Sequence, residues 1–288
     1  MPDGWHLLGA GSMGSLAATR FIDAGFTVRL AGTTPASQVR HLHWPDGHQR
    51  SLLLEADPTK PIKHLIVATK AADTARALYP LLPRLSNELT LVRLQNGLGS
   101  LDKFALPERT RLVEVVTTSG AWREQQTIHV VAENDTLFGD GSDSPPGWFA
   151  ALEKAWPGLR WSADIHHQQL LKLSVNAVIN PLTALHDCTN GSIADDPRLQ
   201  EEARALATEV DLILAALAPD WPGDSATRSF QVARQTAGNT SSMRADLRAG
   251  RITEIDFING WLLRQARNSG IPAPLNQAIY QAVLARHP

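Results

Sequence analysis

Short apolar runs alternate with amphipathic stretches through the first half of the chain. Period-two or fully apolar runs predict strands at 5–8, 26–31, 64–69, 90–94 and 111–116. The stretches 15–25 and 71–85 between them have helical period. This order predicts an α/β fold with a largely parallel, doubly wound sheet. Residues 50–55 are a possible extra strand, and 127–134 and 135–141 are expected to form an antiparallel pair.

The pattern changes near residues 160–164, after which long helical periods dominate and few strand signals remain. We therefore expect two domains, an α/β domain at 1–163 and an all-α domain at 164–288.

One predicted helix, LLKLSVNAVINPLTAL (170–185), carries polar residues in apolar surroundings. Lys172, Asn176 and Asn180 recur at every fourth position, so they share one helical face. A buried lysine is costly unless it is paired, and Pro181 removes a backbone hydrogen bond from the helix. Such a helix suits the wall of a cleft that receives an anionic, oxygen-rich small molecule. The alternative is a lysine that reaches solvent beside two satisfied core amides.

The stretch WHLLGAGSMGS places Gly9, Gly11 and Gly14 between a predicted strand and a predicted helix. In this pattern the first glycine permits a tight turn, the second lets a pyrophosphate approach, and the third allows helix and strand to pack. The motif favours a Rossmann-like dinucleotide-binding domain at 1–163 over a plain structural turn. The second domain, 164–288, would then hold substrate and catalytic groups.

The end of the second predicted strand indicates which dinucleotide binds. An NAD site usually has an acid there, and RLAGTT (29–34) has none. Arg29, Thr33 and Thr34 are candidate contacts to a 2′-phosphate, and Lys70 adds a cation after the third strand, unless it is simply solvated. The pattern favours NADP.

Two further motifs contain candidate site residues. Asn96 ends a strand in LVRLQNGLGS, where it is either a turn residue or a ligand contact at the carboxyl end of the sheet. In NTSSMRADLRAGRITEIDFINGWL (239–262), Ser242 and Glu254 would lie about 18 Å apart along one straight helix. A break at 249–251 would bring them closer. Glu254 is otherwise an ordinary acid in a helix first turn.

Bulk properties exclude several classes of function. A net charge of −2 argues against nucleic acid as a main partner, and the scattered histidines, including the pairs at 41/43 and 166/167, argue against a metal site. The single cysteine, Cys188, fits a reducing compartment. We see no secretory signal and no apolar run of membrane-spanning length, so we expect a cytoplasmic protein.

Taken together, GAGSMG, QNG, KLSVNAVINPLTAL, NTSSMRADL and TEIDFINGWLL resemble the ketopantoate reductase (2-dehydropantoate 2-reductase) family, in the family's order and over nearly the whole chain. The resemblance implies reduction of 2-dehydropantoate to (R)-pantoate with NADPH, in the route to pantothenate and coenzyme A. It implies that Lys172 gives a proton to the substrate carbonyl oxygen and that Glu254 acts with the cofactor ribose and Lys172.

The resemblance also implies binding roles by position. The substrate contacts would be Lys172, Asn176, Asn180, Asn190, Asn239 and Ser242. The cofactor contacts would be Gly9, Ala10, Gly11, Ser12, Met13, Gly14, Thr33, Lys70, Asn96, Ala121 and Glu254. Thr33 is a departure, because some members carry an arginine there.

Two alternatives stay open. A catalytically silent NADP-binding sensor would keep the glycine loop but would not need Lys172 and the asparagines. A reductase of the same chemistry would act on another 2-oxo acid. The sequence does not distinguish a monomer from a homodimer.

Overall fold

The computed structural model describes residues 4–32 and 36–288. The chain divides into two compact units. The first contains Met1–Gln95 and Leu101–His166, and the second contains Asn96–Ser100 and His167–Pro288. The short segment 96–100 therefore belongs with the C-terminal helices, although both of its neighbours in sequence belong to the first unit.

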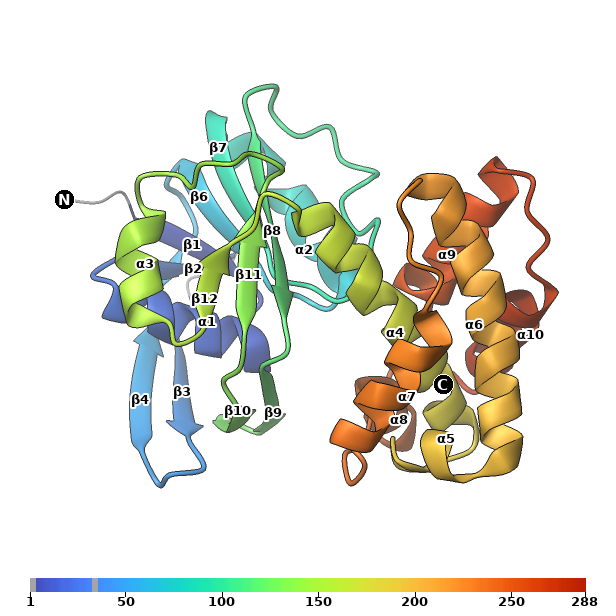
Figure 1. The fold of residues 1–288 in the computed structure, drawn as a ribbon. Coiled ribbons are helices and arrows are strands. Elements are labelled where there is room, and N and C mark those ends of the chain that lie inside the picture. The colour runs from blue at the N-terminus through green and yellow to red at the C-terminus, as the bar shows by residue number, and fades with distance from the viewer. Residues whose placement is uncertain (1–3, 33–35) are drawn as a thin grey trace. The chain divides into compact units, whose positions relative to one another are not determined.

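The first unit is built on a main sheet with the strand order β12-β11-β8-β7-β6-β1-β2-β5 (Figure 1). Its strands are β1 (Trp5–Leu8), β2 (Val28–Ala31), β5 (Ala56–Asp57), β6 (Ile62–Val67), β7 (Leu85–Arg93), β8 (Arg111–Thr117), β11 (Thr136–Gly139) and β12 (Leu159–Trp161). From β5 to β8 every neighbouring pair is parallel, which confirms the predicted sheet. The order reverses at β1, which has β2 on one side and β6 on the other, and ligands bind at such reversals.

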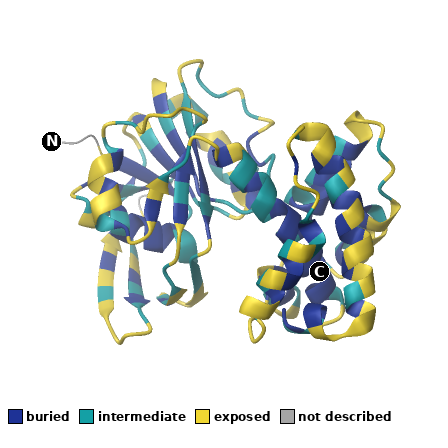
Figure 2. Ribbon diagram, viewed as in Figure 1, coloured by how far each residue is buried: buried dark blue, intermediate teal, exposed yellow. Residues whose placement is uncertain are grey.

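Helices cover both faces of the main sheet. One face packs on α1 (Ser12–Asp23) and α3 (Phe149–Ala155), and the other packs on the segment η1 (Ala71–Asp73), α2 (Thr74–Leu78) and η2 (Tyr79–Arg84). The single helix predicted at 71–85 is wrong, because prolines 80 and 83 interrupt α-helical hydrogen bonding and most of the segment is 3₁₀-helical. Figure 2 shows the resulting core as dark blue strands between partly exposed helices.

A second, smaller sheet has the order β4-β3-β10-β9. Its strands are β3 (Gln38–His43), β4 (Gln49–Leu54), β9 (Gly120–Glu124) and β10 (Thr127–Ala132). The extra strand expected at 50–55 is therefore present, as β4. The expected pairing of 127–134 with 135–141 is wrong. β10 pairs with β9 and β3, whereas β11 joins the main sheet beside β8, so the chain changes sheets between them.

The second unit is helical, as predicted. It contains most of α4 (Ile165–Leu185), followed by α5 (Ser192–Asp195), α6 (Pro197–Leu217), α7 (Ser225–Gln235), α8 (Ser242–Arg248), η3 (Ile255–Phe257), α9 (Asn259–Asn268) and α10 (Pro274–Leu284). Side chains of α4 and of α6 lie in both of its apolar clusters, so these two long helices connect the clusters. None of the helices described is long and apolar enough to cross a membrane.

Candidate active site

The glycine loop of the first unit follows β1 and ends in α1. Gly9 has φ +104°, and a Cβ there would lie 2.5 Å from the Thr69 nitrogen. A Cβ at Gly14 would lie 2.0 Å from the Gly9 oxygen. A Cβ at Gly11, in contrast, would have no described atom within 4 Å. Packing therefore demands glycine at the first and third positions, while Gly11 borders open space of the kind a pyrophosphate would need.

Other residues expected near the cofactor also lie in the first unit. Lys70 is exposed and precedes η1, and Ala121 is half-buried in β9 against the core. Arg29 lies in β2, with its Nε 3.9 Å from Glu55 Oε2. Thr33 and Thr34, the remaining candidates for a 2′-phosphate, lie outside the described residues.

In the second unit, an amide joins a lysine to a carboxylate. Lys172 Nζ in α4 donates to Asn96 Oδ1 at 2.9 Å, and Asn96 Nδ2 donates to Glu254 Oε2 at 3.4 Å. Asn96 is held there by its neighbours, because the Leu98 N–H donates to the Phe257 oxygen at 2.8 Å. Three motifs that are far apart in sequence therefore meet in one hydrogen-bonded trio.

The trio controls the charge of Lys172. Desolvation by burial lowers the pKa of Lys172 from 10.5 to about 8, while the charge of Glu254 opposes the shift. Glu254 is itself only 9% exposed, so little water screens the attraction between its carboxylate and the Lys172 ammonium. The ammonium is thus held as an acid that can release its proton near neutral pH.

Beyond Lys172, α4 places Asn176 in a half-buried position and Asn180 in a buried one. The helix continues through Pro181, which has no N–H to offer the Ala177 carbonyl one turn earlier. Asn259 supplies the missing donor, with its Nδ2 2.9 Å from the Ala177 oxygen. Asn259 was not among the expected residues, since its partner is 82 residues away.

Asn190 and Asn239, both expected to contact substrate, are joined to each other through the backbone. The Asn190 N–H donates to the Asn239 oxygen at 3.1 Å, and Asn190 Nδ2 donates to Thr236 Oγ1 at 3.0 Å. Asn190 Oδ1 is buried and has no hydrogen-bond partner among the described residues. A buried acceptor without a donor is energetically costly.

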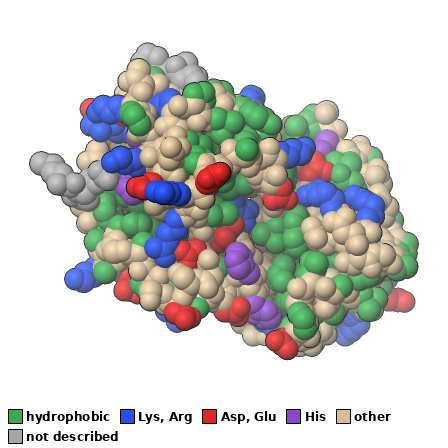
Figure 3. Space-filling model, turned by 90° about the horizontal axis from the view of Figure 1, so that it is seen from above, with side chains coloured by type: hydrophobic (Ala, Val, Ile, Leu, Met, Phe, Trp, Pro, Cys, Tyr) green, Lys and Arg blue, Asp and Glu red, His purple; other side chains and the backbone are tan. Residues whose placement is uncertain are grey.

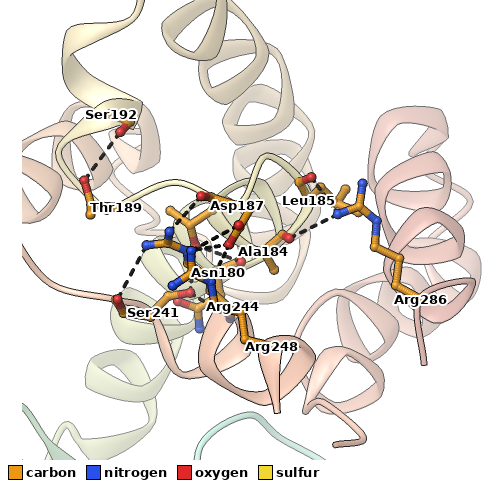
Figure 4. Close-up of polar contacts among 12 residues, drawn as sticks. Asn180, Ala184, Leu185, Asp187, Thr189, Ser192, Ser241, Arg244, Arg248 and Arg286 are labelled. Atoms are coloured by element: carbon orange, nitrogen blue, oxygen red, sulfur yellow. Dashed lines mark hydrogen bonds and ion pairs between the residues drawn. The ribbon is translucent and has the colours of Figure 1, made fainter. Parts of the chain in front are cut away.

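Ser242 is exposed and begins α8, whereas the neighbouring Ser241 is its buried N-cap. Ser241 Oγ accepts from Thr183 Oγ1 of α4 at 2.7 Å, which fastens the start of α8 to α4. Figure 4 shows the other end of α8 fastened too, with the Arg244 and Arg248 side chains pointing toward Asp187. Hydrogen bonds from these arginines hold the pKa of Asp187 well below its usual range.

The expected break between Ser242 and Glu254 is present. α8 ends at Arg248, Gly250 has φ +60°, and Glu254 precedes the short helix η3. The two residues therefore lie on separate elements rather than 18 Å apart on one helix. Glu254 is the N-cap residue of a 3₁₀ turn, and its Oε2 also accepts a hydrogen bond from Asn96 Nδ2.

Comparisons with known proteins agree with this architecture. Residues 5–143 match the sequence model of "Ketopantoate reductase PanE/ApbA", and residues 164–287 match that of its C-terminal domain. A 2-dehydropantoate 2-reductase of Yersinia pestis is 37% identical over 223 aligned positions, covering 76% of this chain and 72% of the relative. One of Vibrio cholerae serotype O1 is 31% identical over 302 positions, covering 96% of this chain and 95% of the relative.

Solved structures share the fold. A PanE/ApbA family ketopantoate reductase from Ralstonia eutropha JMP134 has a TM-score of 0.87 at 20% identity, covering 99% of this chain and 98% of that one. A D-mandelate dehydrogenase complex with NADH and anilino(oxo)acetate has a TM-score of 0.84 at 18% identity, with the same coverage. The fold class is thus a Rossmann-type domain followed by a helical domain. With both family domains matched, the chain belongs to the ketopantoate reductase PanE/ApbA family, which confirms the resemblance seen in its motifs.

Proposed function

We propose that the protein reduces 2-dehydropantoate to (R)-pantoate with NADPH, in the route to pantothenate and coenzyme A. Family membership makes the substrate a small 2-oxo acid, and relatives of similar length carry the 2-dehydropantoate reductase name. The observation that carries the proposal is the trio of Lys172, Asn96 and Glu254, because reduction of a ketone needs an acid held in place at the carbonyl oxygen.

The glycine loop of the first unit would hold the dinucleotide. The open space at Gly11 and the N-terminus of α1 fit a pyrophosphate, which backbone N–H groups there can bind. When bound, the nicotinamide supplies the hydride.

Residues of the second unit would bind the 2-oxo acid and manage its charge. As the carbonyl is reduced, negative charge develops on its oxygen, and the Lys172 ammonium stabilises that charge and then donates a proton to it. Asn96 holds Nζ in position, and Glu254 keeps the ammonium charged despite its burial. The free Asn190 Oδ1 and the exposed Ser242 hydroxyl are the groups proposed to bind the substrate hydroxyl and carboxylate.

The direct test is NADPH oxidation with 2-dehydropantoate, run beside NADH and beside other 2-oxo acids, including an aryl one. Lys172→Ala should lower kcat by about 10²–10⁴-fold, the usual loss for a general acid. Lys154→Ala, which removes an exposed lysine of α3, should leave kcat unchanged. Faster turnover of another 2-oxo acid would reassign the substrate. NADPH binding without turnover of any of them would favour a sensor.

A further inference from the structure

Arg40 is a buried cation whose hydrogen-bond partners among the described residues are all neutral. Its side chain lies in β3, and the residue is 9% exposed. Arg40 Nε donates to the Ala10 oxygen at 3.0 Å, Nη1 donates to the Val39 oxygen at 2.8 Å, and Nη2 donates to Gln38 Oε1. Within the described part of the chain, no Asp or Glu forms an ion pair with it, and each terminal nitrogen keeps one N–H to offer. A buried charge in this state is costly unless a ligand completes it.

A second arginine, Arg123, lies on the same face of the small sheet. It is exposed, and Figure 3 shows how widely Lys and Arg side chains are scattered over one surface of the molecule. Arg123 of β9 is paired across the sheet with Ile128 of β10, which in turn is paired with Leu42 of β3. Residues paired in this way share a face, and Arg40 shares it as well, because it lies two residues before Leu42. The proximity has an electrical effect, because burial and the charge of Arg123 both lower the pKa of Arg40.

The contact with Ala10 places this pair of cations beside the glycine loop. In a trans peptide the carbonyl and the following N–H point in opposite directions. Since the Ala10 carbonyl points at Arg40, the Gly11 N–H points away from it. Arg40 therefore lies beside the glycine loop, on the side of the Ala10–Gly11 peptide away from the Gly11 N–H.

We propose that Arg40 and Arg123 form a phosphate site that receives the 2′-phosphate of NADPH. The adenosine ribose of a dinucleotide lies beside the end of the second strand in this fold. β3, which carries Arg40, is the next strand after β2, and guanidinium groups suit phosphate because they donate two N–H groups in parallel. The proposal rests on the proposed function, because it requires a dinucleotide on the glycine loop.

The test is the dissociation constant of the purified full-length chain for NADPH and for NADH, measured by calorimetry. Arg40→Gln should weaken NADPH binding about tenfold or more and NADH binding less than about threefold, as expected for a lost charge-assisted contact. Arg123→Gln should shift the same ratio in the same direction by about threefold. Arg109→Gln removes an exposed arginine paired with Glu88 in the same unit, and it should change neither constant.

Equal weakening of both nucleotides by Arg40→Gln would overturn the proposal, since Arg40 would then act only by holding the Ala10 carbonyl. If Arg40→Gln does not fold, Arg123→Gln decides, because its side chain is exposed. An unchanged NADPH to NADH ratio in that variant would overturn the proposal. Arg40-dependent preference for NADPH without turnover of any 2-oxo acid would support this site and reject the proposed function. Turnover of 2-dehydropantoate with a preference for NADPH that Arg40→Gln does not change would support the proposed function and reject this site.

Discussion

Glu254→Gln should move the pH dependence of the reaction toward acid. The substitution removes the negative charge beside Lys172 but keeps an oxygen that can accept from Asn96 Nδ2. Because the charge of Glu254 raises the pKa of Lys172 against the effect of burial, its loss should lower that pKa further below about 8. A general acid works only while it is protonated, so activity should be lost at lower pH than in the wild type.

The geometry of the trio sets the size of the shift. With hydrogen bonds of 2.9 Å and 3.4 Å on the two sides of one amide, Lys172 Nζ and Glu254 Oε2 are at most about 9 Å apart. At that distance and an effective dielectric constant of about 20, two unit charges interact with nearly 2 kcal/mol, so the pKa should fall by roughly one unit or more. The alkaline limb should therefore move from near pH 8 to near pH 7.

The assay is kcat against pH with saturating NADPH and 2-oxo acid, over about pH 6 to 10. At about pH 7.5 the shift converts Lys172 from mostly protonated to mostly deprotonated, so kcat should fall severalfold there and recover at lower pH. Glu201→Gln, an exposed acid of α6, should leave the profile in place. An alkaline limb that stays put or moves to higher pH in Glu254→Gln would refute the reasoning, because the titrating group would not be a lysine kept charged by Glu254.

Two other substitutions test how the site is held. Asn259→Ala should leave the Ala177 carbonyl without a donor and lower the free energy of unfolding by about 1–3 kcal/mol in urea denaturation, whereas Asn268→Ala at the exposed end of α9 should cost little. Gly97→Ala places a Cβ 2.4 Å from a backbone oxygen at φ +72° and should lower both stability and kcat, while Gly47→Ala, at φ +87° but in open space, should show only backbone strain and normal kcat. If Asn268→Ala lost as much stability as Asn259→Ala, the hydrogen bond to Ala177 would not be the cause. If Gly47→Ala lost as much kcat as Gly97→Ala, the close approach to Phe257 would not be the cause.

The sequence predicted the five parallel strands β1, β2, β6, β7 and β8 because strands buried on both faces appear as apolar runs. It did not predict the short strands β5 and β12. It also did not predict β3, whose sequence is QVRHLH. In this strand an apolar side chain faces outward and a charged one faces inward, the opposite of the usual pattern. Val39 is exposed, while Arg40 is buried at a core position. Binary patterning assumes that a charged side chain faces water, and here the charge faces the glycine loop. The pattern therefore failed at the position where we propose a contact with the cofactor.

The candidate site divides in the same way. Lys172, Asn176 and Asn180 could be grouped from sequence because helical period is local, and α4 does present them from one helix. The hydrogen-bond partner of Lys172 could not be predicted from helical period, because Asn96 lies 76 residues away in the sequence. Motif resemblance placed both at one site without showing the hydrogen bond between them.

That hydrogen bond bears on how Lys172 is prepared for catalysis. Asn96 follows a strand of the first unit, yet segment 96–100 belongs to the second, where the Leu98 N–H is bound to the Phe257 oxygen. The trio is therefore assembled within one unit, from parts that fold together. Its ammonium needs no nucleotide to become oriented or to have its pKa lowered, so the low pKa of Lys172 should be measurable in the free protein as well as during turnover. If the low pKa arose only with cofactor bound, burial within the second unit would not be its cause.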